Sequence, residues 1–440
     1  MFPGAFPAGA QDRLLPASIP YRFFGTAVVL HLAAWAVLLA AAGEVPGFAG
    51  GLGPVLAALH LVTLGVLAMT ALGAAFQLLP VATSRALGPD WACRLSWWLL
   101  APGVVALAIG MGTGWMTALE GGAVLAAAGL VVGGSLMART LAGVPGLAAI
   151  TRPTWLALAA LLVLAGLGLL LVWDFAAGLL PDHVRVAAVH GLVAGYGFMG
   201  SLALGFSTVL VPMFVLGQPV PDAIGRRCAA LVAAGLVLAA AGALAGLGWL
   251  VVLGGTAGLA AAAMHAIALA KVFKGRMRKR LEPFFRLLLP GWAVLPVSIL
   301  AGMALALGVP VARLAPLWGF LMVFGWLLTV VTGILQRIMP FLASMHTAAA
   351  GGKPALLSGL TARRPLDLHA GLHGLAIVLV AAGILAGSPL LVRLGAAAGL
   401  AGAAAFAAFA IELARRYRAH RLSSLSSSSS PLATTKDVRP

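Results

Sequence analysis

The side chains best suited to chemistry in this sequence are its nine histidines. A neutral imidazole is the commonest protein ligand of haem iron and of copper. His60 and His190 each stand near the start of a long apolar stretch. They precede Pro80 and Pro212 by 20 and 22 residues, so we expect both imidazoles at a similar depth in the membrane. His183 precedes His190 by seven residues and can share its helical face. Position thus makes His60 and His190 candidate ligands of a cofactor or metal, and His183 a third candidate metal ligand.

A second pair, His369 and His373, lies four residues apart, so one helical face can present both imidazoles. The pair could bind a metal ion or a second haem, or the segment DLHAGLH could be the solvated start of a helix. A similar choice applies to His60 and His190, which are either ligands or interfacial histidines with solvated, hydrogen-bonded rings. The sequence contains no P-loop, GxSxG or HExxH motif, and we identify no catalytic residue.

Composition shows what kind of fold must position these residues. Hydrophobic residues make up 62% of the 440, charged residues make up 9%, and the mean hydropathy is +1.07. Because a soluble domain carries about 25% charged residues, this chain must place apolar surface in lipid, and we predict an all-α polytopic membrane protein. Two distant cysteines, Cys93 and Cys228, exclude a disulfide scaffold. The net charge of +17 predicts contact with anionic lipid headgroups and no nucleic-acid partner, since no basic domain stands outside the membrane.

The apolar stretches predict twelve transmembrane helices, because about 20 residues are needed to cross a hydrocarbon core of about 30 Å. Charge clusters and Pro/Gly turns separate the stretches, and the boundary between the seventh and eighth, near Gly246–Gly255, is the least defined. We expect a cytoplasmic N-terminal segment over 1–19, a single membrane domain over 20–415 and a disordered Ser-rich cytoplasmic tail over 416–440. The predicted helices cover approximately 20–42, 54–80, 95–113, 118–138, 154–173, 185–216, 228–248, 250–270, 287–309, 314–339, 369–388 and 391–413.

The basic residues predict the orientation of these helices. Of the 28 lysines and arginines, 25 fall on the side of the termini, and only Arg185, Arg313 and Arg393 fall on the other side. Basic residues concentrate in the cytoplasmic loops of membrane proteins. We therefore predict a multi-pass protein of a bacterial-type inner (plasma) membrane, with both termini cytoplasmic.

Three of the predicted helices share one pattern of two glycines eight residues apart and a proline seven residues later. The copies are offset by 132 and 128 residues, which predicts three four-helix repeats, approximately 20–141, 154–273 and 287–413, with pseudo-threefold symmetry. Glycines at this spacing let another backbone or a flat ligand approach, and the proline ends or kinks the helix. Chance alignment among 56 glycines is the alternative. The positions are Gly65, Gly73 and Pro80, then Gly197, Gly205 and Pro212, then Gly325, Gly333 and Pro340.

This arrangement, with the second helix of each unit innermost, resembles subunit I of the haem-copper oxidase and nitric oxide reductase superfamily. The segments His60-Leu-Val-Thr-Leu-Gly65 and Gly73-Ala-Ala-Phe-Gln-Leu-Leu-Pro80 resemble second-helix sequences of divergent bacterial members. The resemblance covers approximately residues 20–415. It implies that His60 is an axial ligand of a haem near the outer membrane face, and it places His190 in the region of a copper ligand.

The chain also departs from that family. The family's seventh helix carries an adjacent histidine pair and its tenth carries two histidines, whereas residues 225–250 and the segment PLWGFLMVFGW contain none. Ala194 stands where many oxidases have a tyrosine linked to the sixth-helix histidine, and Tyr196 falls on roughly the opposite helical face from His190. All eleven acidic residues lie at or near helix ends or loops, where they cannot carry protons across a membrane.

The resemblance and its departures together predict a haem- or copper-binding membrane protein with a role linked to respiration or nitric oxide, without proton-pumping oxygen reduction and with no enzymatic activity assigned. One alternative is a small-solute transporter or channel, although carriers usually show twofold repeats. Another is a non-catalytic assembly partner that docks on respiratory-chain or oxidase-assembly proteins through the basic loop 271–286. The lipid bilayer is the partner common to all three.

Overall fold

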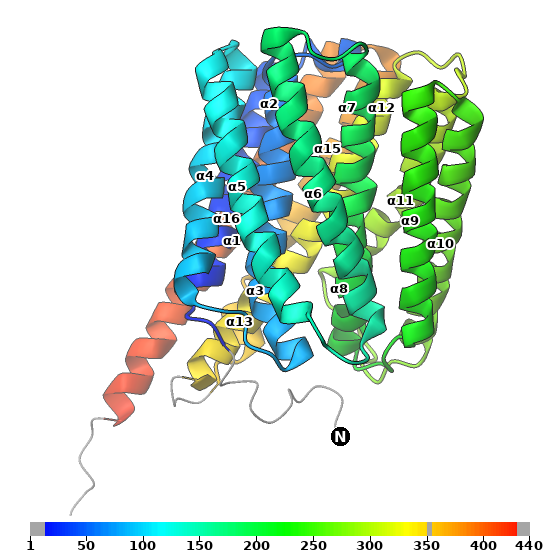
Figure 1. Ribbon diagram of the computed structural model, residues 1–440. Coiled ribbons are helices and arrows are strands. Elements are labelled where there is room, and N and C mark those ends of the chain that lie inside the picture. The colour runs from blue at the N-terminus through cyan, green and yellow to red at the C-terminus, as the bar shows by residue number, and fades with distance from the viewer. Residues whose placement is uncertain (1–13, 350–353, 429–440) are drawn as a thin grey trace, which may run out of the picture.

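The computed structural model describes residues 14–349 and 354–428, and all regular structure in these ranges is helical. Twelve of the helical segments are long and apolar enough to cross a membrane, and they form one bundle (Figure 1). The predicted all-α polytopic membrane fold is therefore confirmed. An even number of spans places the start of α1 and the end of α16 at the same end of the bundle, which we call the terminal end. The opposite end is called the far end.

The spans follow the predicted order closely. Three of them, which we call the central spans, consist of an α-helix, a π-helical segment and a second α-helix: α2–η3–α3 (Pro54–His60, Leu61–Ala68, Met69–Thr83), α7–η4–α8 (His183–Leu192, Val193–Met199, Gly200–Val215) and α12–η5–α13 (Leu314–Phe320, Leu321–Leu328, Thr329–Ala349). The other spans are α1 (Ser18–Ala40), α4 (Asp90–Thr113), α5 (Met116–Leu141), α6 (Ala148–Ala177), α9 (Asp222–Ala245), α10 (Gly248–Lys274), α11 (Phe285–Ala306), α15 (Arg363–Ala386) and α16 (Pro389–Ser428). Short helices η2 (Val45–Gly47) and α14 (Leu357–Leu360) lie in two of the connections.

The central spans form the interior of the bundle. They bury 67%, 78% and 67% of their most apolar window, and no other span in the described residues exceeds 50%. Segment η5 contacts both η3 and η4. The three π-helical segments begin at residues 61, 193 and 321, at the same offsets as the glycine–proline pattern. Shared burial and shared π-helical segments favour the repeat, and the symmetry of the whole bundle stays a prediction.

Some helix ends agree with those predicted from the sequence, and others do not. The uncertain boundary between the seventh and eighth spans lies at Gly246, whose φ of 70° requires the left-handed region that glycine adopts without strain. Helices α3 and α8 end three residues after Pro80 and Pro212, whereas α13 continues beyond Pro340 to Ala349. Helix α16 runs to Ser428, into the stretch predicted to be a disordered tail, and residues 429–440 lie outside the described part of the chain.

Candidate functional site

A cavity of about 670 Å³ lies between the central spans, toward the far end of the bundle. All three central spans line it, together with α5, α6 and the loop 48–51. Its volume falls in the range of about 300–1,000 Å³ that is typical of small-molecule and cofactor sites. The wall is mostly apolar, and no lysine or arginine lines it. We call it the central cavity.

Three predicted ligands, His60, His190 and His183, line the central cavity. His60 and His190 lie on two different central spans, with their ring centroids 6.3 Å apart and their ring planes inclined by 29°. Two imidazoles that share one metal ion, each through a nitrogen at about 2 Å, have centroids about 6 Å apart. The centroid separation is therefore compatible with two imidazoles that would hold one metal ion with their nitrogen-bearing edges, and not their ring faces, turned toward it.

The orientation of His60 is set by its own helix. His60 is the last residue of α2, and its Nδ1–H donates to the carbonyl oxygen of Leu56, 3.0 Å away. A neutral imidazole that donates from Nδ1 keeps its lone pair on Nε2. Histidines that bind metals usually have this kind of second hydrogen bond, which fixes the tautomer and the ring direction.

His190 lies in α7, three residues before η4, and its Nδ1 is buried without a hydrogen-bond partner. Gly168 of α6 lies beside the ring: a Cβ atom at Gly168 would stand 3.3 Å from Cε1 and 3.9 Å from Nδ1 of His190. The absence of a side chain at Gly168 thus leaves room for this ring. A buried imidazole nitrogen without a partner has a cost that a bound ligand or water would remove.

His183 stands at the start of α7, where an acidic residue holds its ring. Its Nδ1 lies 2.6 Å from Oδ2 of Asp174, which is almost fully buried near the end of α6. The other carboxylate oxygen of Asp174 accepts from the backbone N–H of Leu180 at 2.6 Å. Carboxylate–histidine pairs of this kind orient the imidazole and leave Nε2 for a ligand.

The donor set decides which groups the cavity could hold. Within residues 14–349 and 354–428, no three or more His, Cys, Asp or Glu side chains form a group that could hold a metal ion. A haem supplies four nitrogens of its own, so it needs only axial ligands from the protein. The pair His60–His190 therefore suits a haem better than a bare copper ion. Among the described residues no lysine or arginine lines the cavity, so its wall offers no cationic partner for the haem carboxylates.

His369 and His373 are not part of this cavity, and the interpretation of DLHAGLH as a solvated helix start is wrong. Both side chains are buried, at 0% and 1% exposure, six and ten residues into α15. His369 Nδ1–H donates to the carbonyl oxygen of Gly402 at 3.0 Å, and His373 Nε2 lies 2.8 Å from Oγ1 of Thr329. The ring centroids of His31 and His369 are 6.0 Å apart. These histidines belong to the packing between α1, α15 and α16.

Sequence analysis missed two contributors to the site. Asp174 was recognised only as an acidic residue near a helix end, although Gly178 and Pro181 indicated a short turn that could bring it back to His183. Gly168 carried no signal of its own among the glycines of α6.

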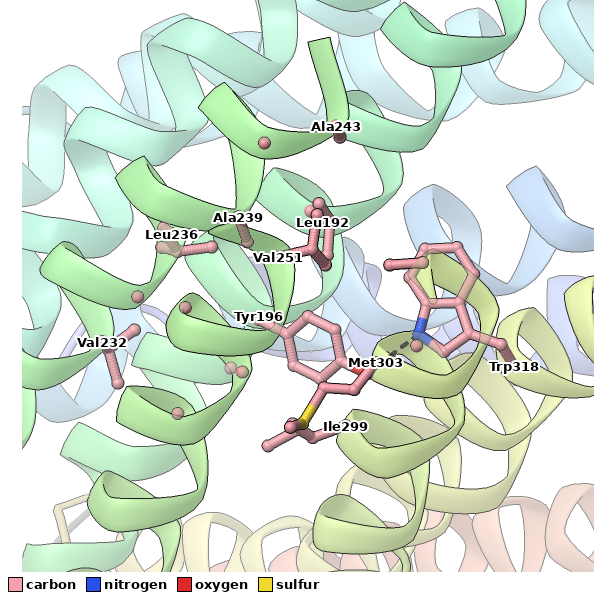
Figure 2. A pocket seen from close by; sticks show the side chains of 18 of the residues that line it. Leu192, Tyr196, Val232, Leu236, Ala239, Ala243, Val251, Ile299, Met303 and Trp318 are labelled. Atoms are coloured by element: carbon pink, nitrogen blue, oxygen red, sulfur yellow. Dashed lines mark hydrogen bonds between the residues drawn. The ribbon is translucent and has the colours of Figure 1, made fainter. Parts of the chain in front are cut away.

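A second cavity of about 290 Å³, the lateral pocket, lies between α9, α10 and α11 and the central spans α7–η4–α8 and α12–η5–α13 (Figure 2). Tyr196 lines this pocket and not the central cavity, in agreement with its predicted position on the other face from His190. Its hydroxyl accepts from Nε1–H of Trp318 at 3.2 Å and donates to Oγ of Ser298 at 3.0 Å.

Comparison with known proteins adds no relative to this description. No protein-family model and no curated protein matches the chain. The likeness to oxidase subunit I therefore depends on the residues quoted from the sequence.

Proposed function

We propose that this protein is an integral membrane haem protein, similar to oxidase subunit I, that binds one haem in the central cavity through His60 and His190. The observation that carries the proposal is the 6.3 Å separation of these two ring centroids in the wall of a mostly apolar cavity of cofactor size. The hydrogen bond from His60 to Leu56 adds to it, because it leaves Nε2 as the ligating atom.

The residues of the chain would give such a site three properties. A haem with two histidine ligands supplies one-electron redox chemistry or the sensing of a small diatomic ligand. The apolar wall excludes water and lowers the local dielectric constant, which tunes the redox potential of a bound iron. The pair His183–Asp174 holds an oriented imidazole in the cavity wall, where its Nε2 can accept a hydrogen bond from an entering ligand or bind a metal ion.

The role we propose is linked to respiration or to nitric oxide, and not to oxygen reduction. The second haem and the copper ion of the oxidases require histidines that this sequence lacks in residues 225–250 and in the segment PLWGFLMVFGW. Copper remains the second candidate for the pair His60–His190, with His183 as a third imidazole in the wall of the same cavity.

The two candidates separate in one experiment. The purified protein is analysed for iron and copper, and its reduced-minus-oxidised absorption spectrum is recorded. A Soret band with about one iron per chain supports the proposal. Copper without a Soret band supports the second candidate, and the absence of both metals contradicts the proposed function.

We further propose a cytoplasmic location for both termini, in a bacterial-type inner membrane, on the basis of the uneven distribution of basic residues. Both native cysteines are buried, so single surface cysteines can report the topology. Lys279→Cys lies in the loop between α10 and α11, and Arg393→Cys lies at the start of α16, and both side chains are exposed. A membrane-impermeant maleimide added to intact cells should label only Arg393→Cys. Labelling of Lys279→Cys alone would show that the orientation is opposite to the one proposed.

A further inference from the structure

The lateral pocket is bounded by the two spans of the bundle that have the least protein cover. Helices α10 and α9 bury only 17% and 28% of their most apolar window, the two lowest values among the described spans. Figure 2 shows Val232, Leu236, Ala239 and Ala243 of α9 on one side of the pocket and Ile299 and Met303 of α11 on another. Apolar spans with so little protein cover expose side chains to lipid, so molecules dissolved in the bilayer lie next to the helices that form the pocket.

The space beside Gly399 of α16 corresponds to the space beside Gly258 of α10, but it is filled by a side chain. Gly258 lies ten residues after the start of α10, and Gly399 lies ten residues after the start of α16. A Cβ atom at Gly399 would stand 2.3 Å from Cε3 of Trp35, a fully buried indole of α1. At Gly258 the nearest atom is Cδ1 of Ile299, 3.6 Å away. Among the described residues, only Ile299 comes within 4 Å of a Cβ atom at Gly258, so the lateral pocket is a space that a separate molecule can occupy.

The correspondence of Gly258 and Gly399 is supported by the helices that precede α10 and α16. Helices α9 and α15 are both 24 residues long, and both are followed by a glycine in the left-handed region, Gly246 with φ 70° and Gly387 with φ 64°. Each glycine lies against an arginine guanidinium, that of Arg185 and that of Arg313. The second and third predicted four-helix repeats thus have similar helix ends. They differ in what fills the space beside Gly258 and beside Gly399.

An arginine that is not itself part of the lining, Arg185, lies beside the far end of the lateral pocket. Gly246 and Gly248 line this end, and a Cβ atom at Gly246 would stand 3.0 Å from Nη2 of Arg185. The Arg185 side chain is about half exposed, donates to the carbonyl oxygen of Leu244 and pairs with Asp182 at 2.9 Å. An exposed ion pair of this kind contributes little energy, so the guanidinium is free to engage a second anion.

The length of the lateral pocket fits a hydrocarbon chain. Along α10 the lining runs from Gly248 to Ala262, which is about 21 Å at 1.5 Å per residue. This is more than half of a hydrocarbon core of about 30 Å. The α10 residues of the lining are all Gly, Ala or Val, and Trp326 and Leu204 also line the pocket.

We propose that the lateral pocket is a binding site for one phospholipid of the far-side leaflet, with an acyl chain between α10 and α11 and the phosphate on Arg185. The guanidinium provides the charge-assisted hydrogen bonds that a phosphate requires. The acyl chain occupies the volume that Trp35 fills beside Gly399. This site is independent of the haem proposed for the central cavity.

The test uses the purified full chain in detergent, incubated with dioleoyl phosphatidylglycerol, and counts bound lipids by native mass spectrometry. We expect the wild type to retain one lipid per chain and Gly258→Phe to retain none. Arg185→Gln should weaken retention roughly tenfold, the scale of one charge-assisted hydrogen bond. Arg393→Gln removes an exposed arginine from the same end and should leave retention unchanged.

Three outcomes would overturn the assignment. Retention of no lipid by the wild type, or equal retention by the wild type and Gly258→Phe, removes the site. Arg185→Gln changes a half-exposed side chain, so it tests the phosphate contact even where Gly258→Phe fails to fold. Trp326 lines the pocket, and its buried Nε1–H has no partner. If Trp326→Phe, and not Arg185→Gln, releases the bound molecule, that molecule carries a hydrogen-bond acceptor at the inner end and is not held by its phosphate.

Discussion

The packing of α6 against His190 provides a sharp test of the central cavity. Gly168 presents only hydrogen to the imidazole, and a Cβ atom there would stand 3.3 Å from Cε1. Ordinary carbon contacts are about 3.5–4.0 Å, so Gly168→Ala must push the ring by a few tenths of an ångström. Gly168→Leu adds three more carbon atoms beside the ring and should force it into another rotamer.

The size of the effect follows from the narrow tolerance of metal bonds. Ligand distances are held to about 0.2 Å, and loss of the residues that support a ligand typically lowers metal affinity about 10- to 100-fold. We therefore expect Gly168→Ala to lower haem affinity about tenfold and Gly168→Leu to lower it at least about a hundredfold. The fold should persist, because Gly168 lies at the cavity and its Cβ meets no backbone atom within 4 Å.

The assay is a haem titration of the haem-free protein, followed by the Soret band. Gly166→Leu is the matched control, since Gly166 lies in the same helix and a Cβ atom there has no neighbour within 4 Å. It should bind haem like the wild type. Wild-type affinity in Gly168→Leu, or an equal loss in Gly166→Leu, would refute the reasoning.

Two further predictions concern stability, measured as the thermal unfolding temperature in detergent. Asp174→Asn replaces one acceptor oxygen by a donor NH₂ group and so disrupts the bond to His183 or to the N–H of Leu180, which should cost about 1–3 kcal/mol; an unchanged unfolding temperature would contradict this role of Asp174. Gly110→Leu places a Cβ atom 2.3 Å from the backbone nitrogen of Leu119 in the contact between α4 and α5, so it should cost about 3 kcal/mol or more. Gly121→Leu, with nothing within 4 Å of its Cβ, should be neutral, and equal destabilisation by both substitutions would show that this close contact is not what matters.

The architecture was predictable because a bilayer reduces the choice of structure. Long apolar runs must be helices there, since every backbone polar group needs an internal partner. The glycine–proline pattern also identified the three innermost spans. The pattern could not show that these spans carry π-helical segments, which insert one residue into a turn and depend on how neighbouring side chains pack.

The site was predictable only in part. A similar depth in the membrane suggested that His60 and His190 could meet, but the separation of the rings depends on how two helices rotate about their axes, which depth does not determine. DLHAGLH is not a solvated helix start, although three charged residues precede its histidines. The buried positions Leu366, His369, His373, Ala376 and Val380 follow a spacing of three and four residues, and this inward stripe was a usable signal.

The central claim is that His60 and His190 hold a haem, and a comparison of two double variants tests it most directly. The reduced-minus-oxidised spectrum is recorded for the wild type, for His60→Ala/His190→Ala, and for His369→Ala/His373→Ala, which removes two buried histidines outside the central cavity. We predict a Soret band in the wild type and in the second variant, and none in the first. A Soret band that persists in His60→Ala/His190→Ala would contradict the claim.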